Sequence, residues 1–178
     1  MSLPTREEAE KLLKDHVSDV YQQHHSHMVA KALEAYAVKM HEDVDLWFVT
    51  GLLHDLDYYK FPDEHPSKSL EWFKEWGYPE ELISAVESHA FMRTGVKPTT
   101  KLGKALIACD EMSGLLYAYS LMRPTGFDGM EVKSVKKKFK DKGFAAKIDR
   151  SDITYGMEEL GVSFEDHIAL LISVFKGS

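Results

Sequence analysis

Apolar residues recur three and four positions apart along most of this chain, and this spacing constrains the fold more than any other feature of the sequence. Side chains at these intervals share one face of an α-helix. Long runs that alternate apolar and polar residues, which predict strands, are absent. The sequence therefore predicts an all-α fold, with helices over residues 4–21, 25–40, 44–56, 66–77, 79–89, 100–119, 132–139 and 163–175.

Residues that favour helix ends support these boundaries. Side chains that can cap a helix N-terminus precede three of the segments: Asp43, Thr99 or Thr100, and Ser163. Pro66 suits a first helical turn, and Gly77 suits a C-terminal stop.

The length of the chain, 178 residues, favours a single domain. The segment 124–129 contains Pro124, Gly126 and Gly129 and is the only candidate for a domain boundary, because it interrupts the helical pattern. We expect one domain over residues 1–178, with a core at about 20–120 and a C-terminal helical extension at about 130–178.

Charge and composition exclude several classes of protein. The chain has 22 Lys and Arg against 29 Asp and Glu, a net charge of −7, which argues against a nucleic-acid partner. The lysine-rich run 133–142 is expected to be a solvated face. Cys109 is the only cysteine, so no intrachain disulfide can form, as in a reducing compartment. The longest apolar stretches are too short to span a bilayer. We therefore expect a cytoplasmic protein without a membrane segment.

Several titratable side chains fall on the apolar faces of the predicted helices. His25 and Asp110 each lie four residues from an apolar residue on the same face, and His54 and Asp55 end an apolar run. Each alone could be a hydrogen-bonded core residue. Burying an unpartnered carboxylate is costly, however, and a metal ion would give all four a common partner. Mixed imidazole and carboxylate ligands suit Fe, Mn, Co, Ni or Zn better than Ca or Mg.

The order of these residues resembles the H…HD…D pattern of the HD-domain superfamily, a group of helical metal-dependent phosphohydrolases. Three segments carry the resemblance: residues 25–30 (HSHMVA), 51–58 (GLLHDLDY) and 104–111 (KALIACDE). The chain is similar over most of its length to a small prokaryotic subgroup of predicted hydrolases. The resemblance implies an HD-domain-like helical bundle with the metal ligands His25, His54, Asp55 and Asp110.

Other histidines stand near these positions. His24 and His27 compete with His25 for the first ligand position. His27 faces a polar side of its helix, whereas His24 shares a stripe with apolar residues. By the resemblance, His65 and His89 look like the extra histidines of family members that hold two metal ions. In members with one ion, residues at these places contact a substrate phosphate instead, and the sequence leaves both interpretations open.

Further residues near the motif are candidates for catalysis and substrate binding. Asp57 could orient a water or pair with Lys60, although an exposed carboxylate at a helix end is the commoner case. His89 could donate a proton as a general acid. Lys60 and Arg93 are candidate substrate contacts, because cationic side chains hold phosphate groups. Glu111, which follows Asp110, could orient a metal ligand through a hydrogen bond without binding the ion itself.

These features predict a metal-dependent phosphohydrolase that acts on a nucleotide or another small phosphorylated metabolite, with one or two divalent transition metal ions. Two alternatives stay open, a di-iron oxygenase of the HD type and a non-catalytic module that binds a metal or a nucleotide. The sequence does not determine the substrate, the metal or the oligomeric state, and a homo-oligomer stays open as well.

Overall fold

The computed structural model describes residues 2–177, and within this range the chain forms ten helices and no strand. The prediction of an all-α fold is confirmed. The helices are α1 (Arg6–His16), α2 (Val20–Met40), α3 (Val44–Leu53), α4 (Ser67–Glu75), α5 (Glu80–His89), α6 (Phe91–Thr94), α7 (Lys101–Leu121), α8 (Val132–Lys140), α9 (Arg150–Leu160) and α10 (Phe164–Lys176).

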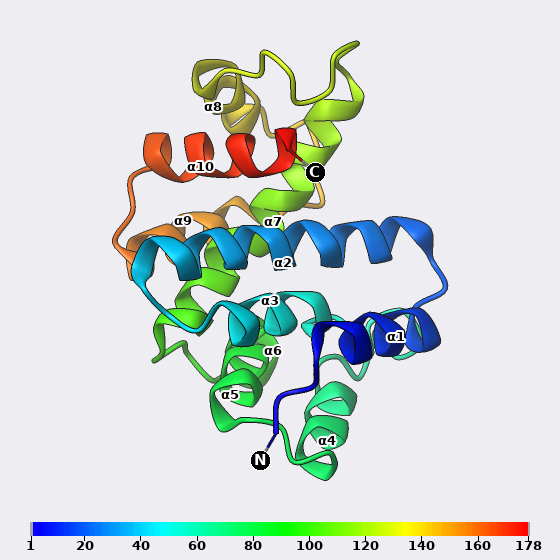
Figure 1. Cartoon of the computed structure of the whole chain (residues 1–178). Helices are drawn as coiled ribbons and strands as arrows, with labels where there is room; N and C mark the ends of the chain where they lie inside the picture. Colours follow the sequence, from blue (N-terminus) through cyan, green and yellow to red (C-terminus); the bar gives the residue numbers. More distant parts are fainter. Residues whose placement is uncertain (1, 178) are drawn as a thin grey trace.

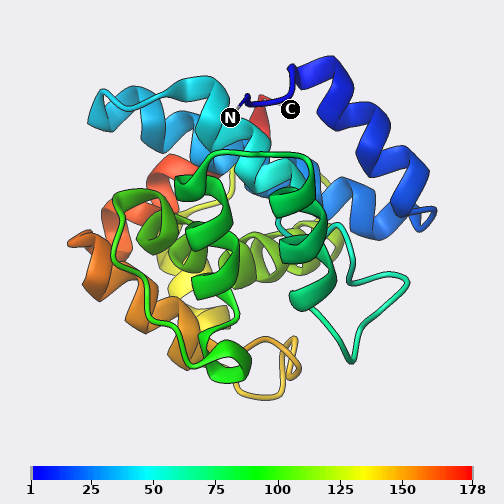
Figure 2. The same ribbon diagram turned by 90° about the horizontal axis from the view of Figure 1, so that it is seen from below.

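Two long helices, α2 and α7, each of 21 residues, cross at the centre of the molecule (Figure 1). Helices α1 and α3–α6 lie on one side of α2, and α8 and α10 lie on the other. Both α5 and α9 pack against α7 (Figure 2). Buried apolar side chains from every described helix except α6 form one continuous core. Among the described helices, none has the length and apolar character that crossing a membrane requires.

Glycines allow two pairs of helices to approach closely near the centre. A Cβ atom on Gly51 of α3 would lie 2.7 Å from the Cα of Ala30 on α2. A Cβ atom on Gly156 of α9 would likewise lie 2.7 Å from the Cα of Ala108 on α7. A side chain at either glycine would push two backbones apart, so these glycines set the spacing of the helices that position the candidate site.

Most of the predicted helix ends are confirmed, and three are wrong: the ends predicted at residues 21 and 56, and the start predicted at residue 25, since α2 begins at Val20. Side-chain caps are present at the starts of three helices: Asp43 before α3, Thr100 before α7 and Ser163 before α10. Residues 4–21 do not form one helix, because the chain is extended at Val17 and the Asp19 side chain caps α2. Helix α3 ends at Leu53 rather than at residue 56, and turns follow over residues 54–60.

Two helices, α6 and α9, escape the sequence prediction. Helix α9 starts after the capping side chain of Asp149 and ends at Gly161, where φ is +74°. It buries Ile153, Gly156 and Met157 and is otherwise mostly polar. Because so few apolar residues mark its inner face, packing against α7 rather than periodicity defines this helix.

Candidate metal centre

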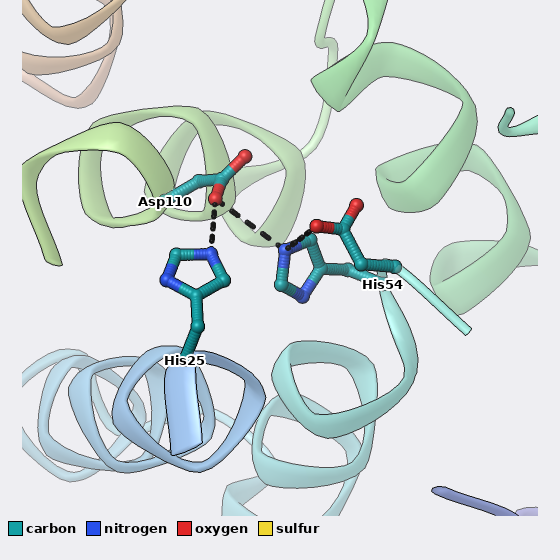
Figure 3. Close-up of side chains that lie close together, drawn as sticks. His25, His54 and Asp110 are labelled. Atoms are coloured by element: carbon teal, nitrogen blue, oxygen red, sulfur yellow. Dashed lines mark hydrogen bonds and ion pairs between the residues drawn. The ribbon is translucent and has the colours of Figure 1, made fainter. Parts of the chain in front are cut away.

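The four predicted ligands converge where three helices meet (Figure 3). His25 projects from α2 and Asp110 from α7, while His54 is the C-cap residue of α3 and Asp55 follows it directly. Each residue offers one ligand atom, and these four atoms lie within 4.8 Å of one another. Two ligands of one ion lie up to about 4.6 Å apart, twice a typical bond length, so the cluster has the size of a single-ion site.

Short polar contacts join the members of this cluster. His25 Nε2 lies 2.9 Å from Asp110 Oδ1. His54 Nε2 lies 3.4 Å from both Asp110 Oδ1 and Asp55 Oδ2. Burial alone would lower the pKa of His54, but the two adjacent carboxylates outweigh burial and raise the pKa well above its ordinary value. The surroundings of His54 Nε2 therefore favour a positive charge.

The imidazole of His54 presents a lone pair at this point. Its Nδ1 lies 2.7 Å from the carbonyl oxygen of Gly51 and must donate, because a carbonyl only accepts. In the neutral ring, Nε2 then carries the lone pair. This Nε2 is buried and has no hydrogen-bond partner among residues 2–177. A buried polar atom that makes no hydrogen bond costs free energy, so the role of metal ligand fits this nitrogen beside two carboxylates.

A second group of donor atoms adjoins the first and shares Asp55. The ligand atoms of Asp55, His65 and His89 also lie within 4.8 Å of one another. His65 Nδ1 donates to Asp57, and His89 Nδ1 donates to the carbonyl oxygen of Val86. In their neutral forms, the two rings therefore direct Nε2 lone pairs at each other across 3.2 Å. Facing lone pairs repel unless a proton or a metal ion lies between them, so this group suits a second cation.

Asp57 is buried, and the expectation of an exposed carboxylate at a helix end is wrong. Its Oδ1 accepts from His65 Nδ1 at 2.7 Å, and its Oδ2 accepts from the backbone N of Ser69 at 3.0 Å. Burial alone would raise the pKa of Asp57, but these hydrogen bonds outweigh burial and lower the pKa. Because the turns after α3 carry Asp57 inward, it orients His65 and does not pair with Lys60.

The two predicted substrate contacts occupy different positions. Lys60 does not reach the cluster, because the turns after α3 direct its Nζ to the carbonyl oxygen of Asp15, at 3.2 Å on the surface. Arg93 on α6 borders the site and donates to the carbonyl oxygens of Pro62 and His65, at 2.6 and 3.3 Å. Of these two residues, Arg93 lines the cavity beside the cluster and Lys60 does not.

The competing histidines on α2 point elsewhere. The ring of His24 packs on Tyr117, with ring centroids 4.5 Å apart. His27 Nε2 lies 2.9 Å from the carboxylate oxygens of Glu10 on α1. Among these three histidines, His25 is the one that the structure brings to the other donors.

A cavity of about 390 Å³ opens beside the two donor groups. Its walls come from α2, α5, α6, α7, the turns after α3, and α9 with the loop before it. Glu111 and Asp152 face this cavity in addition to the candidate ligands. Burial and the neighbouring Asp110 carboxylate raise the pKa of Glu111 to about 8. Glu111 thus borders the open space beside the cluster.

Part of this wall is not predicted from the sequence. Asp152 and Ile148 belong to α9 and to the loop before it, and Tyr21 lies in the first turn of α2. None of the three stands in a recognisable motif, and the inner face of α9 is not visible in the sequence. Only the packing of α9 against α7 brings Asp152 to the cavity.

The sequence of the chain matches the model of one known protein family. The sequence model of the HD domain matches residues 23–115, which is just over half of the chain and includes all the candidate ligands. No curated protein and no solved structure gives a match. The match to the HD domain confirms the resemblance stated above, and the chain belongs to the HD-domain superfamily.

Proposed function

We propose that this protein is a metal-dependent phosphohydrolase that acts on a small phosphorylated metabolite. The observation that carries the proposal is the buried Nε2 of His54, which lies beside two carboxylates without a hydrogen-bond partner among the described residues. Membership of the HD-domain superfamily supports the same function, because metal-dependent phosphohydrolases are typical of that superfamily.

Four residues are proposed to hold the first ion: His25, His54, Asp55 and Asp110. Their nitrogen and oxygen donors suit a divalent Fe, Mn, Co, Ni or Zn ion. Such an ion, when bound, supplies Lewis acidity towards a phosphoryl oxygen and lowers the pKa of a coordinated water. The chain contributes a ligand set that is fixed in advance, since the carbonyl of Gly51 holds the His54 ring in one orientation.

His65, His89 and Arg93 supply the groups on the cavity side. When they carry a proton, the Nε2 atoms of both histidines can donate to a phosphate oxygen or, where one ion is bound, pass the proton to the leaving group. Asp57 fixes the ring of His65 through Nδ1. The Arg93 guanidinium can contact a phosphate from α6.

Elemental analysis of the purified protein and turnover of an aryl phosphate with added Mn²⁺ test the proposal. His89→Ala should lower turnover by roughly 10²–10⁴-fold, because it removes a proton donor. The variant should keep its first ion, since His89 is not among the four proposed ligands. His41→Asn, at the exposed C-cap of α2, is the matched control and should retain activity. Full activity of His89→Ala would contradict the catalytic assignment.

The sharing of Asp55 between the two donor groups favours one further candidate, a di-iron oxygenase. Iron loading under nitrogen followed by exposure to air separates the two functions. An oxygenase would change colour and consume oxygen with its substrate, whereas a hydrolase would release phosphate with redox-inactive Zn²⁺. A protein that binds metal but does neither would be a binding module.

A further inference from the structure

We infer that the substrate is a phosphomonoester of an amino alcohol, with its phosphate at the histidines and its ammonium group beside Glu111, Asp152 and the tyrosines of the cavity. This inference rests on the proposed function and narrows it to one substrate class. It follows from the charge, the aromatic surface and the size of the cavity.

The cavity wall carries two carboxylates besides those of the candidate ligands. Glu111 lies on α7, and Asp152 borders the same space from α9. Both side chains are partly buried, and each can accept a hydrogen bond from a ligand in the cavity. Carboxyl groups at the wall of a cavity suit a positively charged ligand, whose charge favours their ionised form.

The same wall opposes a polyphosphate. Arg93 is the one Lys or Arg that lines the cavity within the described residues, and two carbonyl oxygens already accept from its guanidinium. A nucleoside triphosphate would bring several negative charges next to Glu111 and Asp152. A single phosphate can lie at the histidine cluster, Arg93 and the proposed ions, whereas the further phosphates of a nucleotide would extend towards these two carboxyl groups.

Tyrosines complete a surface that suits an organic cation. Tyr21 and Tyr58 line the cavity, and the ring of Tyr21 lies 5.6 Å from that of Tyr117. The faces of tyrosine rings attract ammonium groups, and both rings are exposed to a ligand that enters the cavity. The cavity volume of about 390 Å³ is near the lower end of the range for small-molecule sites, about 300–1,000 Å³. A small amino alcohol therefore matches the wall in both charge and size.

Three substrates offered to the metal-loaded protein test this inference: phosphoethanolamine, glycerol phosphate and ATP. The first two are similar in size, but only phosphoethanolamine carries an ammonium group. We expect its kcat/KM to exceed that of glycerol phosphate by about tenfold, the effect of one charge-assisted contact. Asp152→Asn should abolish most of this preference. Glu158→Gln, exposed on the same helix, should preserve it.

Equal kcat/KM values for the two small esters, a preference for ATP, or an unchanged preference in Asp152→Asn would overturn the inference and leave the phosphohydrolase proposal intact. Absence of all phosphate release would contradict the proposed function instead. In that case, calorimetric measurement of ethanolamine binding to the metal-loaded protein still tests whether the cavity holds an ammonium group. Binding that weakens about tenfold in a folded Asp152→Asn variant supports the cation site, whereas absent or unchanged binding overturns it.

Discussion

Asp55 is the residue on which both donor groups depend, because its two oxygens face different partners. Oδ2 lies 3.4 Å from His54 Nε2, whereas Oδ1 lies 3.3 Å from His65 Nε2 and 3.4 Å from His89 Nε2. A carboxylate in this position can serve two neighbouring cations at once. Its loss should therefore affect both groups, whereas the loss of His89 should affect only the second.

Asp55→Ala should abolish metal binding and leave a folded helical protein. The substitution removes a negatively charged ligand from the cluster, so both the affinity and the neutralisation of the ion are lost. Elemental analysis after loading with Mn²⁺ or Zn²⁺ measures the metal content, and circular dichroism measures whether the variant stays helical. Asp166→Ala, an exposed change on α10, should keep the metal. Metal content equal to that of the wild type in Asp55→Ala would refute the ligand assignment.

Individual residues show why the candidate site is only partly predictable. The helical period places His25 and Asp110 on inward faces, because each shares its face with apolar neighbours. Nothing periodic places Asp57, which lies in the turns after α3, and its burial follows from hydrogen bonds to His65 and Ser69. The position of Lys60 depends on the same turns.

At the scale of elements, α10 is joined to the two central helices by His167. Its Nδ1 accepts from the hydroxyl of Tyr36 on α2, and its Nε2 donates to the carbonyl oxygen of Ala108 on α7 at 2.8 Å. The ring is fully buried, and burial lowers the pKa of His167 to about 4. The neutral ring therefore connects α10 to the segment of α7 that carries Asp110.

This connection should weaken as the pH falls. The pKa of His167 is about 4 in the folded protein and about 6.5 in the unfolded chain, so the unfolded state binds more protons between these values. Between pH 7 and pH 5, this group should lower the free energy of unfolding by about 2 kcal/mol. Urea unfolding of the metal-free protein and of His167→Gln at both pH values measures the difference. An equal loss in the two proteins would show that His167 is not responsible.

The contact between α9 and α7 should not tolerate a methyl group. Gly156→Ala places a Cβ atom 2.7 Å from the Cα of Ala108, so we expect a loss of about 1–3 kcal/mol in the free energy of unfolding. Gly114→Ala is the matched control on α7, because its Cβ would meet only the Ile148 side chain at 3.5 Å. Helix propensity favours alanine there, so the control should be neutral or slightly stabilising. Similar denaturation curves for the two variants would contradict the close approach.

Helix boundaries can be predicted where a side chain marks them. Asp43, Thr100 and Ser163 each cap a helix through a hydrogen bond to the backbone three residues on, a local interaction that the sequence reveals. Helix α9 escapes prediction because its inner face consists of little more than Ile153, Gly156 and Met157. Its existence depends on α7, which is distant in the sequence, and local patterns cannot reveal it.

For the molecule as a whole, metal removal should lower stability. The proposed ligands come from α2, the end of α3, and α7, so a bound ion would cross-link the centre of the fold. An ion at about 100 times its dissociation constant adds about 2.7 kcal/mol. For a chain of this size, that should raise Tm by about 5–11 °C. Thermal unfolding with Mn²⁺ and with EDTA measures the shift, which Asp55→Ala should lose. An equal shift in that variant would place the ion elsewhere.

His25 and Asp110 stand 85 positions apart, and the segment of α7 that bears Asp110 is held from behind by α9 and α10. During translation, the first three proposed ligands therefore leave the ribosome long before Asp110. Helices α9 and α10, which hold Asp110 in place, leave it later still. An ion captured at that stage would have an incomplete set of donors and would exchange readily. Retention of metal would thus indicate that synthesis and folding of the chain have included α10.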